Sequence, residues 1–358
     1  MTITEIARHF AVSAVTVSNA LNRKKGVAAE KAEEIRRYAK EHGYQPSYLA
    51  KSLLNGQTSL IGLCLRGPLT DPWYAALIND IQCRLFEHRL YLNTITAYQS
   101  RMTPEQAVER ERWVLDFFRQ IKAEVIAIGP LDGQRYRALG DTVARQGDLV
   151  MFGCTEPLDG TWLGLDIGDG CRQALGCLTA NGHRRIGYLG ANGFDETYSG
   201  GETRFSAYCN YLHNAGLPFE KRWIIHGNGW KGPEEIVPAF RRLLASGGEL
   251  PTAYFCHSDN FALVATRTLA EFNLHVPDDV SLVGFDNQPV AALAMPGFTT
   301  IGFDLEHYAG KLVECILGKV RARRSGKLRF EPWSYSEPAQ LIVRNSVKKV
   351  SGTGTARR

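Results

Sequence analysis

The spacing of apolar residues near the N-terminus predicts short amphipathic helices. Ile3, Ile6, Ala7 and Phe10 form one stripe at helical spacing, and Val17, Ala20 and Leu21 form a second. Ser13 precedes the second stripe, and a serine hydroxyl can accept a backbone N–H at the start of a helix. A run over 29–42 predicts a third helix that Gly43 ends. Two short helices joined by a tight turn are typical of a helix-turn-helix, which places its second helix in the major groove of DNA.

From residue 60 onward, short apolar segments alternate with longer helical patterns. The predicted strands lie at 60–65, 90–95, 125–128, 149–152, 185–190, 223–225, 252–256 and 281–285, and the predicted helices at 73–88, 104–120, 170–182, 203–215, 233–246 and 259–272. This alternation is typical of a doubly wound α/β fold with parallel sheets. The units are too many for one sheet, so we expect two similar lobes with a cleft between them. Ligands of such sheets bind at the carboxyl ends of the strands.

Several short motifs of the first 62 residues occur in a fixed order. They are Thr2-Ile3-Thr4-Glu5-Ile6-Ala7, Val12-Ser13 followed by Thr16-Val17-Ser18, Leu21-Asn22, Gly43-Tyr44-Gln45-Pro46, Ala50-Lys51-Ser52-Leu53 and Ile61-Gly62. In these motifs the chain resembles the lactose/purine-repressor (LacI-type) transcription regulators, and the resemblance covers nearly the whole chain. It implies a two-lobed body like the periplasmic sugar-binding proteins, a homodimer, a pseudo-palindromic DNA operator and a small-molecule effector bound between the lobes.

The expected domain organisation follows from the patterns and the resemblance together. Residues 1–45 form an all-α helix-turn-helix headpiece, 46–58 a hinge helix or linker, and 59–345 an effector-binding and dimerisation domain. We expect the N-lobe to comprise about 59–163 and 297–329, and the C-lobe about 164–296 and 330–345. The remaining tail, 346–358, is expected to be disordered.

Charge and composition support a DNA-binding protein. The formal net charge is +5, and residues 1–60 hold nine Lys and Arg against five acids, so most of the excess lies in the predicted headpiece. We find no apolar run of membrane-spanning length and no signal peptide, so we expect a cytoplasmic, nucleoid-associated protein. The eight cysteines are scattered without Cys-x-x-Cys spacing, which indicates reduced, buried thiols rather than a metal site, and no cofactor is expected.

The resemblance assigns residues to DNA. The expected contacts are Thr2, Ser13, Ala14, Val15, Thr16, Ser18, Asn19, Asn22, Tyr44, Ser47 and Leu53. Asn19 stands where the family commonly has arginine. Asparagine suits adenine whereas arginine prefers guanine, so we expect an operator that depends less on guanine at that step. Ala14 and Val15 offer apolar contact, which suits a thymine methyl group.

Two further positions concern the hinge and the turn. Leu53 matches the hinge leucine that wedges into the minor groove in this family, and packing against the headpiece is the alternative. Ala11 occupies a turn position where the family usually has glycine. If φ is positive there, alanine costs up to ~1 kcal/mol relative to glycine.

Polar and aromatic residues at strand ends form the predicted effector site. By resemblance they are Asp71, Trp73, Tyr74, Arg204, Trp230, Asp259 and Asp286. Carboxylates accept hydrogen bonds from sugar hydroxyl pairs, arginine donates to sugar oxygens, and tryptophan covers the apolar face of a pyranose. Asp259 could instead cap the following helix, and either tryptophan could belong to the core. Gly200 stands where a hydroxyl-bearing side chain often helps to bind sugar, and Cys154 where an acid can occur, so the site copies no single sugar-responsive member.

The sequence leaves other functions open. A purine- or nucleoside-responsive regulator of the same family is the main alternative, and a sugar-binding protein without a DNA role is a weaker one. An enzyme is disfavoured, because His183 lies in a Gly-His-Arg-Arg turn typical of the family and Gly168-Asp169-Gly170 is only a fragment of a dinucleotide fingerprint. We therefore expect a DNA-binding transcriptional regulator, a repressor whose operator affinity depends on a small molecule, with a sugar as the favoured effector.

Overall fold

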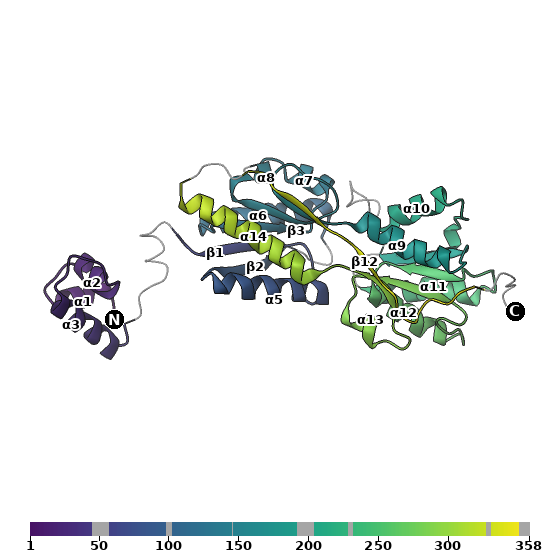
Figure 1. The fold of residues 1–358 in the computed structure, drawn as a ribbon, viewed down its shortest axis with the longest axis horizontal. Coiled ribbons are helices and arrows are strands. Elements are labelled where there is room, and N and C mark those ends of the chain that lie inside the picture. The colour runs from purple at the N-terminus through teal and green to yellow at the C-terminus, as the bar shows by residue number, and fades with distance from the viewer. Residues whose placement is uncertain are drawn as a thin grey trace. The chain divides into compact units, whose positions relative to one another are not determined.

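The computed structural model describes residues 1–44, 57–97, 102–144, 146–191, 204–227, 232–326 and 331–350. The chain forms two compact units, 1–58 and 59–358 (Figure 1). Most of the predicted hinge, 46–58, lies outside the described residues. None of the described helices has the length and apolar character needed to cross a membrane.

The first unit is a bundle of three short helices. They are α1 (Ile3–His9), α2 (Ala14–Leu21) and α3 (Ala29–Glu41). Its small core consists of Ile6, Ala7, Val17, Ala20, Ala32, Ile35 and Ala39. The members from α1 and α2 belong to the two apolar stripes that predict the helix-turn-helix, so this prediction is confirmed. Ala11, in the turn between α1 and α2, has φ 50° and is exposed.

The second unit contains two six-stranded sheets. In the first lobe the strand order is β11-β5-β4-β3-β1-β2 and every pair is parallel. Its strands are β1 (Leu60–Leu65), β2 (Tyr91–Thr96), β3 (Val125–Gly129), β4 (Leu149–Cys154), β5 (Trp162–Leu165) and β11 (Ser334–Glu337). Its helices are α5 (Pro72–Glu87), α6 (Pro104–Gln120), α7 (Gly133–Leu139), α8 (Asp141–Ala144), a 3-10 turn at Gln146–Asp148 and α14 (Leu305–Arg324).

The second lobe repeats the arrangement with the order β12-β10-β9-β8-β6-β7. Only β12 is antiparallel to its neighbour among the described strands. The strands are β6 (Ile186–Ala191), β7 (Ile224–Gly227), β8 (Ala253–Cys256), β9 (Ser281–Phe285), β10 (Thr299–Gly302) and β12 (Gln340–Ile342). The helices are α9 (Ile167–Ala180), α10 (Arg204–Asn214), α11 (Val237–Ala245), α12 (Asp259–Ala270) and α13 (Pro289–Leu293), with 3-10 turns at Lys221–Trp223 and Pro233–Ile236. The doubly wound, two-lobed fold is confirmed.

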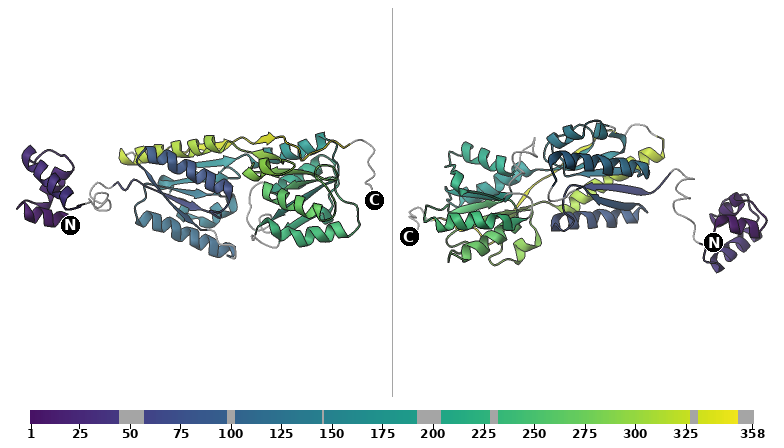
Figure 2. Two further views of the ribbon diagram at one scale, coloured as in Figure 1. Left: turned by 90° about the horizontal axis from the view of Figure 1, so that it is seen from below. Right: turned by 180° about the vertical axis from the view of Figure 1, so that it is seen from behind.

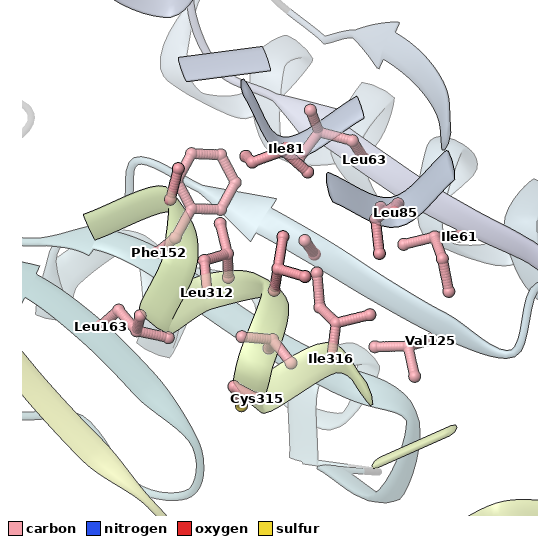
Figure 3. Close-up of a cluster of buried hydrophobic side chains, with 14 of the residues drawn as sticks. Ile61, Leu63, Ile81, Leu85, Val125, Phe152, Leu163, Leu312, Cys315 and Ile316 are labelled. Atoms are coloured by element: carbon pink, nitrogen blue, oxygen red, sulfur yellow. The ribbon is translucent and has the colours of Figure 1, made fainter. Parts of the chain in front are cut away.

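Both faces of each sheet are buried by helices. In β1, Leu63 faces a core shared with α5 and α14, whereas Cys64 faces a core shared with α6 and α7. Figure 3 shows Leu312 and Ile316 of α14 packed with Ile81 and strand residues in the first of these cores. In the second lobe, Leu282 and Val283 of β9 divide in the same way between α11–α12 and α9–α10. Strands buried on both faces must be apolar throughout, and polar side chains are therefore confined to their ends.

The chain passes between the lobes three times, and the crossings lie later than the sequence indicates. They follow β5, β10 and β11, at about residues 166, 303–304 and 338–339. The expected crossings near 163–164, 296–297 and 329–330 are therefore displaced, because each crossing follows a strand of only four residues that the alternation does not predict. Figure 2 shows α14 returning along the first lobe after the second crossing.

The expected disordered tail begins too early. Residues 346–350 are ordered against the second lobe, where Ser346 is fully buried and its hydroxyl accepts a hydrogen bond from the Thr299 N–H at 2.8 Å. The Lys348 carbonyl lies 3.0 Å from Nε2 of His183, whose Nδ1 lies 2.9 Å from Thr252 Oγ1. His183 is thus a buried structural residue. Residues 351–358 lie outside the described part of the chain.

The backbone at Ala11 generates a stability prediction. A left-handed conformation is strained in alanine and free of strain in glycine, so Ala11→Gly should stabilise the first unit by up to ~1 kcal/mol. Ala11→Val should destabilise it, because a β-branched side chain is less tolerated at positive φ. Hydrogen exchange of peptides from residues 3–41, measured in the full chain, checks both changes. Slower exchange in the valine variant than in the glycine variant would contradict this explanation.

Candidate functional site

The first turn of α2 presents small side chains outward. Val17 and Ala20 fix the helix in the core, while Ala14 is exposed and the Val15 side chain is 68% exposed. Ser13 caps the helix, since its Oγ accepts the Thr16 N–H at 3.0 Å and lies 2.8 Å from Thr16 Oγ1. The helix-turn-helix thus exposes the side chains that this motif uses to reach base edges.

The C-terminal end of α2 is held by α3. Arg36 donates from Nη1 to the Ala20 carbonyl at 2.9 Å and also pairs with Glu33 of its own helix. A guanidinium at this position is favourable, because a helix C-terminus carries unsatisfied carbonyls and partial negative charge. Asn22 ends α2, and its Nδ2 donates to the Ser18 carbonyl at 2.9 Å.

The other predicted DNA contacts are distributed around the headpiece. Thr2 caps α1 in a capping box with Glu5 and is exposed. Asn19 is partly exposed, and Tyr44 packs partly buried against the headpiece core. The structure therefore leaves most of these side chains open to a ligand. Ser47 and Leu53 lie outside the described residues.

Two predicted effector residues form an ion pair in the second lobe. Arg204, the first residue of α10, donates from Nη2 to Asp286 Oδ1 at 2.7 Å, and both side chains are about 15% exposed (16% and 15%). Nη1 also donates to the His257 carbonyl, and the guanidinium lies 4.1 Å from the Phe285 ring centroid. The arginine is thus held in one orientation at the carboxyl end of β9.

The position of Asp286 follows from the end of β9. Phe285 is the last buried strand residue, and Asp286 turns the chain with φ 85°. Burial raises the pKa of the Asp286 carboxyl, and the neighbouring Arg204 opposes this shift. The carboxylate and the guanidinium together offer hydrogen-bond acceptors and donors at one point.

Asp259 lies deeper in the same lobe. It is the first residue of α12 and fully buried, and its Oδ2 accepts the Gln288 N–H at 2.7 Å. Burial raises its carboxyl pKa to about 7. A Cβ on Gly284 would lie 2.1 Å from Asp259 Oδ1, so β9 needs glycine there to admit the carboxyl group. Asp259 thus supports the segment that carries Asp286.

Two predicted effector residues of the first lobe, Asp71 and Tyr74, lie near the polar residues of the second lobe. Asp71 caps α5 by accepting the Trp73 N–H at 2.8 Å, and the same oxygen lies 3.5 Å from Gln288 Nε2 of the second lobe. Tyr74 packs over Gly67, where a Cβ would lie 2.2 Å from its ring. Burial is the main cause that raises the pKa of the Tyr74 hydroxyl, Asp71 and Asp286 raise it further, and Arg66 and Arg204 oppose the shift.

Of the two tryptophans predicted to contact the effector, only Trp73 lies within the described residues. Trp73 is partly buried, packs against the first-lobe core and meets Tyr74 edge to face with ring centroids 5.1 Å apart. Trp230 lies outside the described residues, as does Gly200. Cys154 is buried at the end of β4, where burial raises its thiol pKa. All eight cysteines are free thiols.

Sequence reasoning missed several residues of the second-lobe group. Gln288 contacts both lobes: its backbone N–H donates to Asp259 Oδ2, and its Nε2 lies 3.5 Å from Asp71 Oδ1. Its Oε1 accepts a hydrogen bond from Asn260 Nδ2 at 2.6 Å. His257 lies 3.1 Å through Nδ1 from the Tyr188 hydroxyl, and burial lowers its pKa well below the usual range. His257 directly follows a buried strand, the same feature that indicates Asp286, and could have been found in that way.

The donors and acceptors of the assembled group are suited to a polyhydroxylated ligand. Within the described ranges, no cluster of three or more His, Cys, Asp or Glu side chains could hold a metal ion. Carboxylates accept from hydroxyl groups, the guanidinium donates to oxygens, and Tyr74 is close to these polar groups.

Two known protein families match different parts of the chain. Residues 2–47 match the family described as bacterial regulatory proteins, lacI family, and residues 175–347 match the periplasmic binding protein-like domain. Together the two matches cover more than half of the chain.

Individual relatives align over nearly the full length. The HTH-type transcriptional repressor PurR of Vibrio vulnificus is 25% identical over 98% of this chain and 99% of its own. PurR of Vibrio parahaemolyticus is 27% identical with the same coverage.

Solved structures share the fold. The Lac repressor dimer bound to operator and the anti-inducer ONPF superimposes with a TM-score of 0.80 at 21% identity, over 97% of this chain and 99% of that chain. The complex of the transcriptional regulator CelR with cellobiose has a TM-score of 0.64 at 23% identity, with the same coverage.

The helix-turn-helix with its exposed second helix, the two-lobed body and both family matches agree. The chain belongs to the lacI family of bacterial regulatory proteins.

Proposed function

We propose that this protein is a homodimeric transcriptional repressor whose affinity for a pseudo-palindromic operator is controlled by a sugar bound between the lobes. The Arg204–Asp286 pair carries this proposal, because it presents a charged donor and a charged acceptor at the end of a buried strand. The relatives named as repressors and the operator-bound Lac repressor dimer support the DNA half and the dimer. They also favour a regulator over an enzyme, in keeping with a cytoplasmic protein.

The charged side chains near the ends of the strands favour a sugar as the effector. Asp71, Arg204 and Asp286 combine two carboxylates with one guanidinium, which matches the alternating donors and acceptors of vicinal hydroxyls. CelR, a fold relative, binds cellobiose. Effector binding would change the balance between lobe arrangements by a coupling free energy of typically ~1–3 kcal/mol, whose sign makes the effector an inducer or a co-repressor.

The ion pair generates a binding prediction. A thermal-shift screen of mono- and disaccharides, sugar phosphates, nucleosides and purines should give a sugar as the stabilising ligand. Asp286→Asn and Arg204→Lys should each weaken that sugar roughly ten- to hundredfold, since hydrogen bonds to charged groups contribute about 1.5–3 kcal/mol. Arg241→Gln, which disrupts an exposed pair with Glu271, is the control and should bind normally. A purine as the only stabilising ligand would overturn the sugar assignment and leave the repressor.

The recognition helix generates a specificity prediction. In vitro selection with the full chain should yield operators without a guanine requirement at the step read by Asn19, because asparagine pairs with adenine N6 and N7. Asn19→Arg should introduce a guanine preference there, worth about 1–3 kcal/mol of discrimination. Glu41→Gln is the control, because Glu41 is exposed at the end of α3, is not among the expected DNA contacts, and should leave the base preference unchanged. A guanine requirement in the natural protein would contradict the role of Asn19.

Asp259 generates a pH prediction. Its folded-state pKa of about 7 lies above the ordinary value of 3.8, so the folded protein keeps a proton that the unfolded chain releases. The free energy of unfolding should therefore fall as pH rises from about 4 to about 7. In the Asp259→Asn variant the side chain is neutral at every pH, so this pH-dependent loss of stability should disappear. The free energy of unfolding of the variant relative to the natural protein should therefore be higher at pH 8 than at pH 5. Denaturant unfolding at both pH values measures this, with exposed Asp141→Asn as control. An equal effect at both pH values would show that Asp259 does not titrate in this window.

A further inference from the structure

Three chain segments meet where the linker enters the body. Ser59, directly before β1, accepts the Tyr91 N–H through its carbonyl at 2.8 Å and donates its own N–H to Glu124 Oε1 at 2.7 Å. Its hydroxyl lies 3.4 Å from Nη2 of Arg324, at the end of α14. The first residue of the body is therefore fixed by β2, β3 and α14 together.

A buried ion pair holds α14 at the same edge. Glu124 is only 3% exposed and receives two hydrogen bonds of 2.8 Å from Nε and Nη2 of Arg324. Arg323 donates from Nη1 to the carbonyls of Ala123 and Glu124, at 3.1 and 2.8 Å. Both views of Figure 2 show the end of α14 beside the start of β1. The edge is thus a rigid platform.

Cations project from this platform into solvent. Arg89 and Lys122 are exposed at turns with φ 57° and 58°, directly before the β2 and β3 segments that contact Ser59 and Arg323. Arg321, one helical turn before Arg324, is exposed as well. Among the described residues, neither Arg89 nor Arg321 has an ion-pair or hydrogen-bond partner for its side chain.

The concentration of charge is local. Outside residues 1–60 the chain has 33 Lys and Arg against 32 Asp and Glu, so the body as a whole is nearly neutral. At this edge Glu124 is paired with Arg324, Asp116 and Asp148 share Arg119, and Glu87 is exposed in the segment before Arg89. In formal charge, Arg89, Lys122, Arg321 and Arg323 exceed Glu87 and the one acid that Arg119 does not neutralise by two, and the helix ends of α5, α6 and α14 add partial negative charges that attract these cations.

We propose that this basic edge, formed by Arg89, Lys122, Arg321 and Arg323, binds phosphates of the DNA that the headpiece holds. The inference rests on the proposed operator binding. The linker of residues 45–58 spans at most ~50 Å when extended, so DNA on the headpiece stays within reach of Ser59. Arginine and lysine on a fixed edge neutralise phosphates without reading sequence, and they strengthen binding to every duplex alike.

The salt dependence of DNA binding tests the proposal in the full chain. The probe is the tightest duplex from in vitro selection, with an unrelated duplex of equal length beside it. The variant Arg89→Gln/Lys122→Gln/Arg321→Gln should bind both duplexes at least about tenfold more weakly at low salt. Its plot of log affinity against log salt should be shallower by about 0.9 for each phosphate that the variant no longer neutralises. Arg323 is left intact because it holds the edge together.

Two control variants separate charge from folding. Lys221→Gln/Arg242→Gln/Lys349→Gln removes the same charge from exposed positions of the second lobe and should keep the natural slope. Arg89→Lys/Arg321→Lys keeps the charge at the edge and should also keep the slope. If the edge variant retains the natural slope and affinity, the edge does not bind DNA and the inference is overturned. If the natural protein binds no duplex, both this inference and the proposed function fail.

Discussion

The burial of both faces of two parallel sheets is the constraint on which the rest of the body depends. Because β1, β3, β8 and β9 have helices on either side, every residue along them must be apolar or very small. Polar groups can then appear only where strands end. The ion pair of Arg204 with Asp286, the buried Asp259 and the Asp71 cap all lie at such ends. The chemistry of the site is thus a consequence of how the core is built.

A single helix connects the crossing region between the lobes to the residue where the linker enters the body. Helix α14 begins directly after the second crossing and ends in the Arg324–Glu124 contact that fixes Ser59. Tyr308, near its start, donates to the Leu163 carbonyl and accepts the Gly153 N–H, so the helix is also attached to the sheet. One continuous helix of 20 residues, about 30 Å long, therefore links the crossing region to the linker entrance.

The sequence predicts most of the long elements, but the expected helices end at residue 272 and omit α14, which has 20 residues and is the longest described helix. The headpiece helices and strands such as 281–285 follow from clear periodicity, and the predicted helix 104–120 has the observed bounds. The alternation also does not predict β5, β10, β11 or β12, because three or four residues carry too little periodicity. The ordering of 346–350 depends on contacts with His183 and Thr299, which are remote in sequence.

The candidate site likewise contains residues that the sequence predicts and residues that it does not. Asp286 and Arg204 could be proposed from strand ends and the resemblance, and the structure brings them within 2.7 Å. Gln288 could not, because its importance comes from hydrogen bonds to Asn260 and Asp71, which belong to different elements. The buried state of Asp259 likewise depends on the missing side chain of Gly284. The roles of Gln288 and Asp259 therefore depend on which residues contact them in the folded chain and not on their residue types alone.

The threefold crossing has a consequence for biosynthesis. Each lobe is assembled from separate stretches of chain, and the first lobe lacks β11 and the second lacks β12 until residues 334–342 have been synthesised. Until then β5 and β10 present open edges, which can pair with other chains. The headpiece precedes both lobes and can fold before them, whereas both lobes must wait until residues 334–342 have left the ribosome. A chain that stops before residue 334 therefore has two incomplete sheets instead of one.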